Sequence, residues 1–141
     1  MEVYVNHLGA MQFDIKARRH SVVSDQPVEN GGFDEGMTPP EFLLAALGSC
    51  AAYYAAEYLR KKGLAKEGTA VRVTAEKLLK PPRLDNFRIE IDAPVALNAE
   101  HKAGVEEAVK HSLIHNTLLH PPKIELDIRK GPPAGKMPVA A

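Results

Sequence analysis

Apolar and polar residues alternate in three short segments near the start of the chain, residues 2–8, 11–17 and 20–24. A period of two is typical of strands with one buried face, and the breaks between these segments are short. We therefore predict three strands joined by tight turns. Residues 25–37 then show neither a strand period nor a helix period, and a connection of this length is usually functional or packed against a partner.

The pattern changes to that of a helix at Thr38. Thr38 is a good N-cap, Pro39 loses no hydrogen bond at the first helical position, and Glu41 completes a capping box. Lys62 would interact favourably with the C-terminal end of the helix dipole, and Gly63 favours the end of the helix. We predict one long helix between Thr38 and Gly63.

This helix is apolar on every face between residues 42 and 54, interrupted only by the small residues Gly48, Ser49 and Cys50. A helix that is hydrophobic all round is buried on all sides, and one modest sheet covers only one of them. We therefore expect a second subunit to cover the rest. The most apolar stretch, 42–56, is shorter than the about 20 residues of a membrane span, so we interpret it as a buried helix of a soluble protein.

Strand and helix patterns return in the second half of the chain. Residues 69–80 and 84–93 alternate and predict a hairpin, Asn98 predicts the N-cap of a second helix, and alternation in 124–129 predicts a last strand. The predicted buried stripe of the second helix consists of Val105, Ala108, Val109, Ser112 and Asn116.

The order of these elements, βββ-α-ββ-α-β, contains no repeating βαβ unit and therefore predicts an α+β fold. We expect residues 1–129 to form a single domain. Residues 130–141 are rich in Pro and Gly and are predicted to be a flexible tail.

Composition and charge exclude several classes of function. The 18 basic and 18 acidic residues give a net charge of zero, which argues against binding to nucleic acid or to an anionic membrane. The single cysteine excludes an intrachain disulfide framework, a four-cysteine zinc site and a Cys-x-x-Cys redox motif. The N-terminus has no signal-peptide pattern, which makes the cytoplasm the expected location. No phosphate-binding or dinucleotide-binding motif is present, so no cofactor is predicted.

Cys50 is the first candidate for chemistry, and two interpretations are open. A free cysteine in an apolar helix is often a small, inert core residue. A nucleophilic Cys50 would instead need a nearby cation to stabilise its thiolate, and the candidates are Arg18, Arg19, His20 and His115.

Two further candidate sites have simpler structural explanations. Glu41 could act as an acid or base, but it lies nine residues before Cys50, which places the two on opposite faces of one helix, so the capping role suffices. His111, His115 and His120 include the His-x-x-x-His spacing of some metal sites. These histidines would also suit a solvated helix end, so no metal is predicted.

Four stretches of the sequence together resemble the OsmC/Ohr family, and especially its short OsmC-like branch. The most specific is the helix block from Thr38 to Cys50, which contains Gly-Ser-Cys. The full set is His20-Ser21-Val22-Val23-Ser24-Asp25-Gln26-Pro27, Asn30-Gly31-Gly32, Thr38 to Cys50, and Ile114-His115-Asn116-Thr117-Leu118 followed by Pro121-Pro122.

The resemblance implies an intertwined homodimer around two long central helices, and reduction of organic hydroperoxides by two cysteines. Cys50 matches the cysteine attacked by peroxide, whereas Ser112 stands where the family has its resolving cysteine. Because a serine cannot form a disulfide, a sulfenate on Cys50 would need an external thiol. Glu41 matches the family's glutamate at the start of the helix, with a spacing to Cys50 one residue shorter. No arginine matches the family's thiolate partner around residues 7–10.

Two functional hypotheses follow. The first is an OsmC-like homodimer that acts as a one-cysteine thiol peroxidase in oxidative stress defence, with Cys50 as nucleophile and Glu41 as positioning group. The alternative is a non-redox homodimer that binds a ligand or serves as a scaffold and has lost the peroxidase activity.

Overall fold

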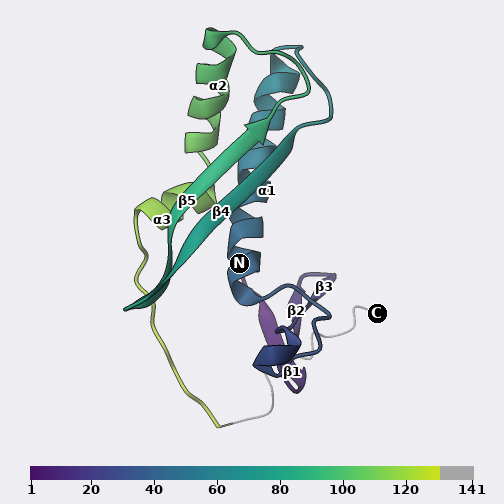
Figure 1. Cartoon of the computed structure of the whole chain (residues 1–141), viewed down its shortest axis with the longest axis vertical. Helices are drawn as coiled ribbons and strands as arrows, with labels where there is room; N and C mark the ends of the chain where they lie inside the picture. Colours follow the sequence, from purple (N-terminus) through teal and green to yellow (C-terminus); the bar gives the residue numbers. More distant parts are fainter. Residues whose placement is uncertain (131–141) are drawn as a thin grey trace. The chain divides into compact units, whose positions relative to one another are not determined.

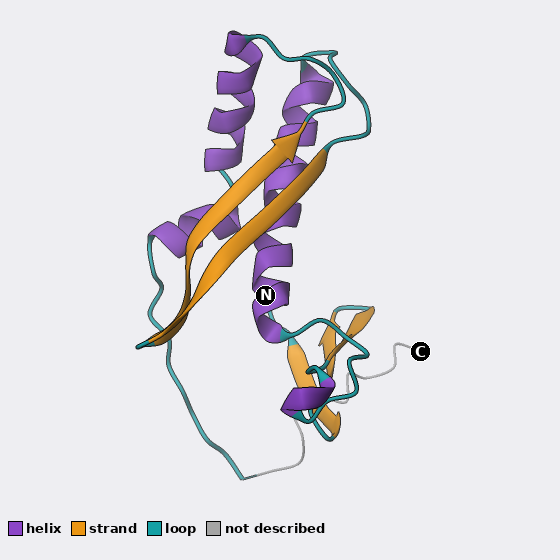
Figure 2. Ribbon diagram, viewed as in Figure 1, coloured by secondary structure: helices purple, strands orange, loops and turns teal. Residues whose placement is uncertain are grey.

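A computed structural model describes residues 1–130 of the chain (Figures 1 and 2). It contains two compact units, one of Met1–Phe42 with the C-terminal stretch that begins at Glu125, and one of Leu43–Ile124, and each is described by itself. The predicted tail beyond residue 130 lies outside the described residues. In chain order the elements are β1 Tyr4–Gly9, β2 Gln12–Ala17, β3 His20–Ser24, the short 3-10 helix η1 Val28–Asn30, α1 Pro39–Lys61, β4 Ala70–Leu79, β5 Pro82–Asp92, α2 Ala99–Lys110 and α3 Leu113–Leu119.

The first unit is built on an antiparallel sheet with the order β1-β2-β3. The predicted strands 2–8, 11–17 and 20–24 are confirmed to within two residues at each end. Tight turns connect them, with positive φ values of 44° at Ala10 and 56° at Arg18.

The helix α1 begins at Pro39 and ends at Lys61, as its capping residues predict. Gly63 follows with a φ of 68°, a conformation that glycine adopts without strain. Leu47, Ala51, Ala55 and Leu59 repeat every fourth residue and form its buried face.

The other faces of α1 are only partly covered within one chain. Leu43 is 37% exposed and Tyr53 is 61% exposed, although both are apolar or aromatic residues of this long apolar helix. Complete burial of this helix, which its sequence predicts, is therefore not achieved by a single chain. Among the described residues, α1 is the one helix that would pass for a membrane span by length and composition, a criterion that core helices of soluble proteins also meet.

In the second unit, α1 and α2 lie side by side against the β4–β5 hairpin (Figures 1 and 2). The buried core consists of Ala51, Ala55 and Leu59 from α1 with Val105 and Val109 from α2, and Val71, Ile89 and Ile91 of the hairpin pack against it. The predicted hairpin is confirmed, with strand β5 beginning earlier than expected, at Pro82.

Gly104 allows α2 to approach α1 at the ring of Tyr58. A Cβ atom at position 104 would overlap the Tyr58 hydroxyl oxygen and the ring carbon that bears it. The same hydroxyl lies 3.1 Å from Nδ1 of His101 on α2, and the two rings meet edge to face with centroids 6.1 Å apart. Tyr58 therefore connects the two core helices by packing and by one hydrogen bond.

Gly104→Ala is expected to destabilise the protein by about 1 to 3 kcal/mol, because the added methyl overpacks the contact with Tyr58. This would reverse the gain of about 1 kcal/mol that alanine normally gives in a helix interior. Urea unfolding followed by circular dichroism measures the change. Ala103→Gly, at the exposed neighbouring position, measures the effect of helix propensity alone. If Gly104→Ala no longer destabilises the protein when it is introduced into Tyr58→Ala, the loss is due to the clash with Tyr58.

The second helix predicted from periodicity is in fact two helices. Helix α2 ends at Lys110, and α3 starts at Leu113 with Ser112 as its N-cap. The prediction of one helix running through Ser112 to Asn116 was wrong because a serine hydroxyl competes for backbone amides and favours a helix start. The N-cap role of Asn98 is confirmed, since its side chain accepts a hydrogen bond from the His101 amide at 2.8 Å.

The predicted last strand is also wrong for the single chain. Residues 124–129 form no strand, and Ile124, Leu126 and Ile128 are 87–88% exposed. Alternation of apolar and polar residues shows that a segment would be amphipathic if it were extended. A strand also needs a neighbouring strand for its backbone hydrogen bonds. The described part of the chain supplies no such neighbour, so the observed order is βββ-α-ββ-α-α within an α+β fold.

Candidate thiol site

Cys50 lies in the middle of α1 as a free, half-buried thiol. Helical geometry places Ala46, Leu47, Tyr53 and Tyr54 on the same side of the helix, three or four residues away. The rings of Tyr53 and Tyr54 meet edge to face with centroids 5.2 Å apart. No hydrogen bond or ion pair involves the Cys50 sulfur among residues 1–130. The thiol therefore has an apolar and aromatic surrounding on its own helix.

The turn before Cys50 approaches strand β4 closely. A Cβ atom at Gly48 would lie 3.0 Å from Cγ2 of Val73, which is tighter than ordinary side-chain contact. A hollow of about 280 Å³ opens at this point, lined by Leu44, Ala45, Gly48, Ser49, Val71 and Val73. Gly48 thus allows helix and hairpin to meet, on the face of α1 roughly opposite to the one that carries Cys50.

Glu41 occupies the first turn of α1 and is exposed. Its Oε2 accepts the Thr38 amide at 2.7 Å and the Thr38 hydroxyl at 2.8 Å. These hydrogen bonds, first that of the amide and then that of the hydroxyl, lower the pKa of Glu41 below its usual value. The carboxylate half of the predicted capping box is therefore present. Along one regular helix Glu41 and Cys50 are about 13 Å apart and on opposite faces, so α1 does not bring them together.

Ser112 is completely buried between α2 and α3. Its hydroxyl accepts a hydrogen bond from the His115 amide at 3.4 Å, and its own amide donates to the Val109 carbonyl at 2.9 Å. Ser112 therefore has a structural role, as the N-cap of α3, in the position where the sequence resemblance places a resolving cysteine.

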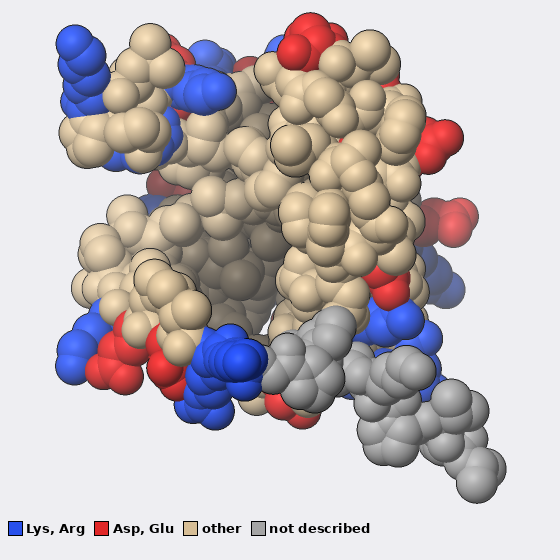
Figure 3. Space-filling model, turned by 90° about the horizontal axis from the view of Figure 1, so that it is seen from below, with Lys and Arg blue, Asp and Glu red and all other residues tan. Residues whose placement is uncertain are grey.

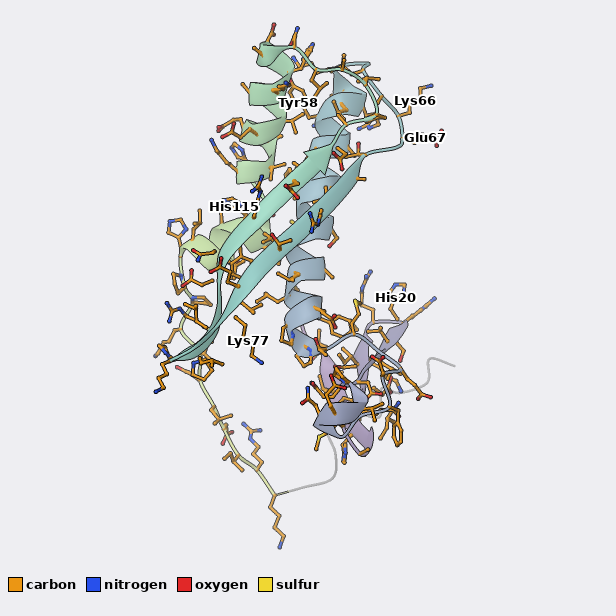
Figure 4. All side chains as sticks on the ribbon, viewed as in Figure 1. His20, Tyr58, Lys66, Glu67, Lys77 and His115 are labelled. Atoms are coloured by element: carbon orange, nitrogen blue, oxygen red, sulfur yellow. The ribbon has the colours of Figure 1, made fainter. Side chains whose placement is uncertain are left out.

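The four candidate cations belong to different parts of the chain. Arg18 and Arg19 occupy the turn between β2 and β3, with His20 at the start of β3, and all three are exposed residues of the first unit. His115 belongs to α3, in the same unit as Cys50, and it lines two cavities of that unit (Figure 4). Of the four candidate cations, His115 is half-buried and the other three are exposed.

The histidines of the second half do not assemble a metal site. Nδ1 of His111 lies 2.9 Å from the Glu107 carbonyl oxygen, and Nδ1 of His120 lies 3.1 Å from that of Asn116. Within residues 1–130 no group of three or more His, Cys, Asp or Glu side chains is arranged to hold a metal ion. The metal alternative for His111, His115 and His120 therefore has no geometric support.

Asp25 is a buried residue of the stretch from His20 to Pro27, and the sequence predicts no role for it. Its carboxylate is fully buried and accepts hydrogen bonds from the amides of Gln26, Phe33 and Glu35 and from the Gln12 side chain, at 2.7 to 3.2 Å. Burial raises its pKa, but these four hydrogen bonds outweigh burial and hold the pKa below its usual value.

Two glycines make room for this arrangement of the 25–37 loop. A Cβ at Gly32 would overlap the Gln26 carbonyl oxygen and lie 2.6 Å from Oδ1 of Asp25, and one at Gly36 would overlap the Val23 carbonyl oxygen. The Asp25 amide also donates to the Met37 carbonyl at 3.3 Å. The loop that leads into α1 is therefore folded around Asp25. The sequence signal for it was an Asp followed by Gly31-Gly32 within an aperiodic segment.

The chain matches one known protein family. The profile of the family described as OsmC-like protein matches residues 32–127. The chain belongs to the OsmC-like protein family. The resemblance drawn from the sequence is thereby confirmed. The OsmC-like fold is that of a soluble protein, so we interpret α1 as its core helix and not as a membrane span. A search of curated proteins gave no significant match.

Solved structures with the same fold extend the comparison of this OsmC-like chain. One is a Psychrobacter arcticus protein described as an osmotic stress induced and detoxification response protein, with a TM-score of 0.74 and 20% identity over 82% of this chain and 85% of that one. An OsmC-like protein from Mycoplasma pneumoniae has a TM-score of 0.62 and 21% identity over 78% and 80%. The Legionella pneumophila organic hydroperoxide resistance protein OsmC has a TM-score of 0.59 and 12% identity over 83% and 87%. At these identities the likeness concerns the fold.

Proposed function

We propose that this OsmC-like protein is a homodimeric thiol peroxidase that reduces organic hydroperoxides through Cys50 and an external thiol. The observation that carries the proposal is a free, half-buried cysteine on the central helix of this fold. The names of two structural relatives, which refer to detoxification and to hydroperoxide resistance, point in the same direction.

The reaction would proceed in three balanced steps. The Cys50 thiolate attacks one peroxide oxygen, so that an S–O bond forms, the O–O bond breaks and the alkoxide leaves as the alcohol after taking a proton. An external thiol then attacks the sulfur of the sulfenic acid, releasing water and leaving a mixed disulfide. A second external thiol exchanges with it and releases free Cys50 and the oxidised reductant. The external thiol is required because Ser112 cannot resolve the sulfenate.

The proposed homodimer is supported by apolar surface that one chain leaves open. Leu43 and Tyr53 on α1 are partly exposed, and the alternating residues of segment 124–129 are almost fully exposed. Burying such groups stabilises an assembly through the hydrophobic effect. A second copy could also place its Glu41 near the thiol, the role of positioning group that one helix alone does not provide. Sedimentation velocity of the full chain tests the assembly, and a monomer at all concentrations would contradict it.

The proposal includes a cytoplasmic location and neither a bound cofactor nor a metal. It includes neither a nucleic acid nor a membrane partner, in keeping with the net charge of zero. Side chains of both signs are visible in Figure 3. A chain with a net charge of zero gives little long-range attraction for a polyanion.

The chemistry is tested by treating the full chain with stoichiometric cumene hydroperoxide in the presence of dimedone, which reacts with sulfenic acids. We expect mass spectrometry to find the dimedone adduct on the peptide that contains Cys50. Recovery of unmodified Cys50 after prolonged treatment would contradict the proposal.

A non-redox homodimer that binds a ligand or acts as a scaffold is the second candidate function. The observation that favours it is Ser112, which is committed to capping α3 and leaves Cys50 without a resolving partner in its own chain. This candidate predicts a Cys50 that does not react with a maleimide in the folded protein, whereas rapid labelling would count against it.

A further inference from the structure

A second cavity in the unit Leu43–Ile124 does not include Cys50 in its lining. It has a volume of about 600 Å³ and lies between β5, the segment that follows β5, α2 and α3. This volume falls in the range of small-molecule sites, about 300 to 1,000 Å³. Its apolar lining includes Ile89, Ile91, Val95, Leu97, Val105 and Val109.

Charged side chains of α2 line one side of this cavity. Lys102, Glu106 and Lys110 follow one another at intervals of four residues and therefore share a helix face. Lys110 and Glu106 form an ion pair at 2.9 Å and neutralise each other. Lys102 has no acidic partner within residues 1–130, so its ammonium group remains available to a ligand.

Two other polar groups limit where an anion can bind. Asp92, at the end of β5, also lines the cavity and would repel a carboxylate placed next to it. The half-buried imidazole of His115, on the α3 side, can donate a hydrogen bond (Figure 4). The favourable position for an anion is therefore the α2 side of the cavity, next to Lys102.

We propose that this cavity binds an apolar small molecule that carries one carboxylate, with the apolar part against Ile89, Ile91 and Val105 and the carboxylate next to Lys102. Apolar walls supply the affinity of such a site, and a single unpaired cation fixes the orientation of the ligand. The proposal goes beyond the thiol chemistry and does not depend on it, because Cys50 does not line this cavity.

Octanoate is a suitable probe, and octylammonium is its control because it has the same alkyl chain and the opposite charge. In a titration of the full chain followed by 15N–1H NMR, we expect saturable shifts from octanoate in the amides of residues 89–97 and 102–110. Octylammonium is expected to bind more weakly. Lys102→Glu should weaken octanoate at least roughly fivefold, the equivalent of about one exposed ion pair.

Lys66→Glu is the matched control, since Lys66 is an exposed lysine in the loop after α1 and outside the cavity lining (Figure 4). It should leave octanoate binding unchanged. Absence of saturable binding, which would also result if a second copy of the chain covers the cavity, would overturn the proposal. So would equal affinity for the two probes, equal effects of the two lysine variants, or shifts confined to other residues. Cys50→Ser should bind octanoate like the wild type, which separates this proposal from the peroxidase proposal.

Discussion

Cys50→Ser is expected to abolish the consumption of cumene hydroperoxide by the protein in the presence of excess dithiol. The serine hydroxyl remains protonated at neutral pH and is a far weaker nucleophile than a thiolate, so no sulfenate can form. We expect the rate to fall by at least about 100-fold, to that of the peroxide and dithiol alone. The measurement is the loss of hydroperoxide with time at equal protein concentrations.

Ser49→Ala is the control for this substitution. Ser49 is the adjacent residue, is exposed, and donates its hydroxyl to the Ala46 carbonyl at 3.2 Å within the helix. Its loss removes a local hydrogen bond without touching the sulfur, so the rate should stay near that of the wild type. Equal rates for wild type and Cys50→Ser would eliminate the peroxidase proposal and leave the ligand-binding or scaffolding alternative.

Features encoded by local sequence were predictable. The start of α1 at Pro39 follows from Thr38, Pro39 and Glu41, and its end from Gly63, because capping and backbone conformation depend on a few neighbouring residues. The position of Cys50 on that helix followed from the same signals.

Features that depend on contacts distant in sequence, or on two competing local signals, were not predictable in the same way. Alternation in 124–129 predicts a strand, but its formation requires a neighbouring strand that the described part of the chain does not supply. At Ser112 the helical period predicted a continuous helix, whereas the capping tendency of serine prevailed. The burial of Asp25 depends on donors from positions 12, 33 and 35, which no local pattern connects.

Asp25→Ala is expected to destabilise the first unit by about 3 kcal/mol. The substitution removes an acceptor of four hydrogen bonds and leaves the amides of Phe33 and Glu35 without their partner, at a cost of about 1 to 3 kcal/mol for each donor that stays buried. Hydrogen exchange is the decisive measurement, because it reports on these two amides directly. We expect them to lose protection while amides of α2 in the other unit keep theirs.

The same carboxylate predicts how the stability of the loop depends on pH. Because the pKa of Asp25 is lower in the folded than in the unfolded state, its stabilising contribution is fully present above the unfolded value near 4. It is lost as the pH falls from there through the lower folded value. Protection of the Phe33 and Glu35 amides should therefore decrease below about pH 4 in the wild type. In Asp25→Asn this acid-dependent step should be absent, since an amide does not titrate. Asp34→Asn, at an exposed position of the same loop, should keep the wild-type profile, and an identical profile in all three proteins would refute the role of Asp25.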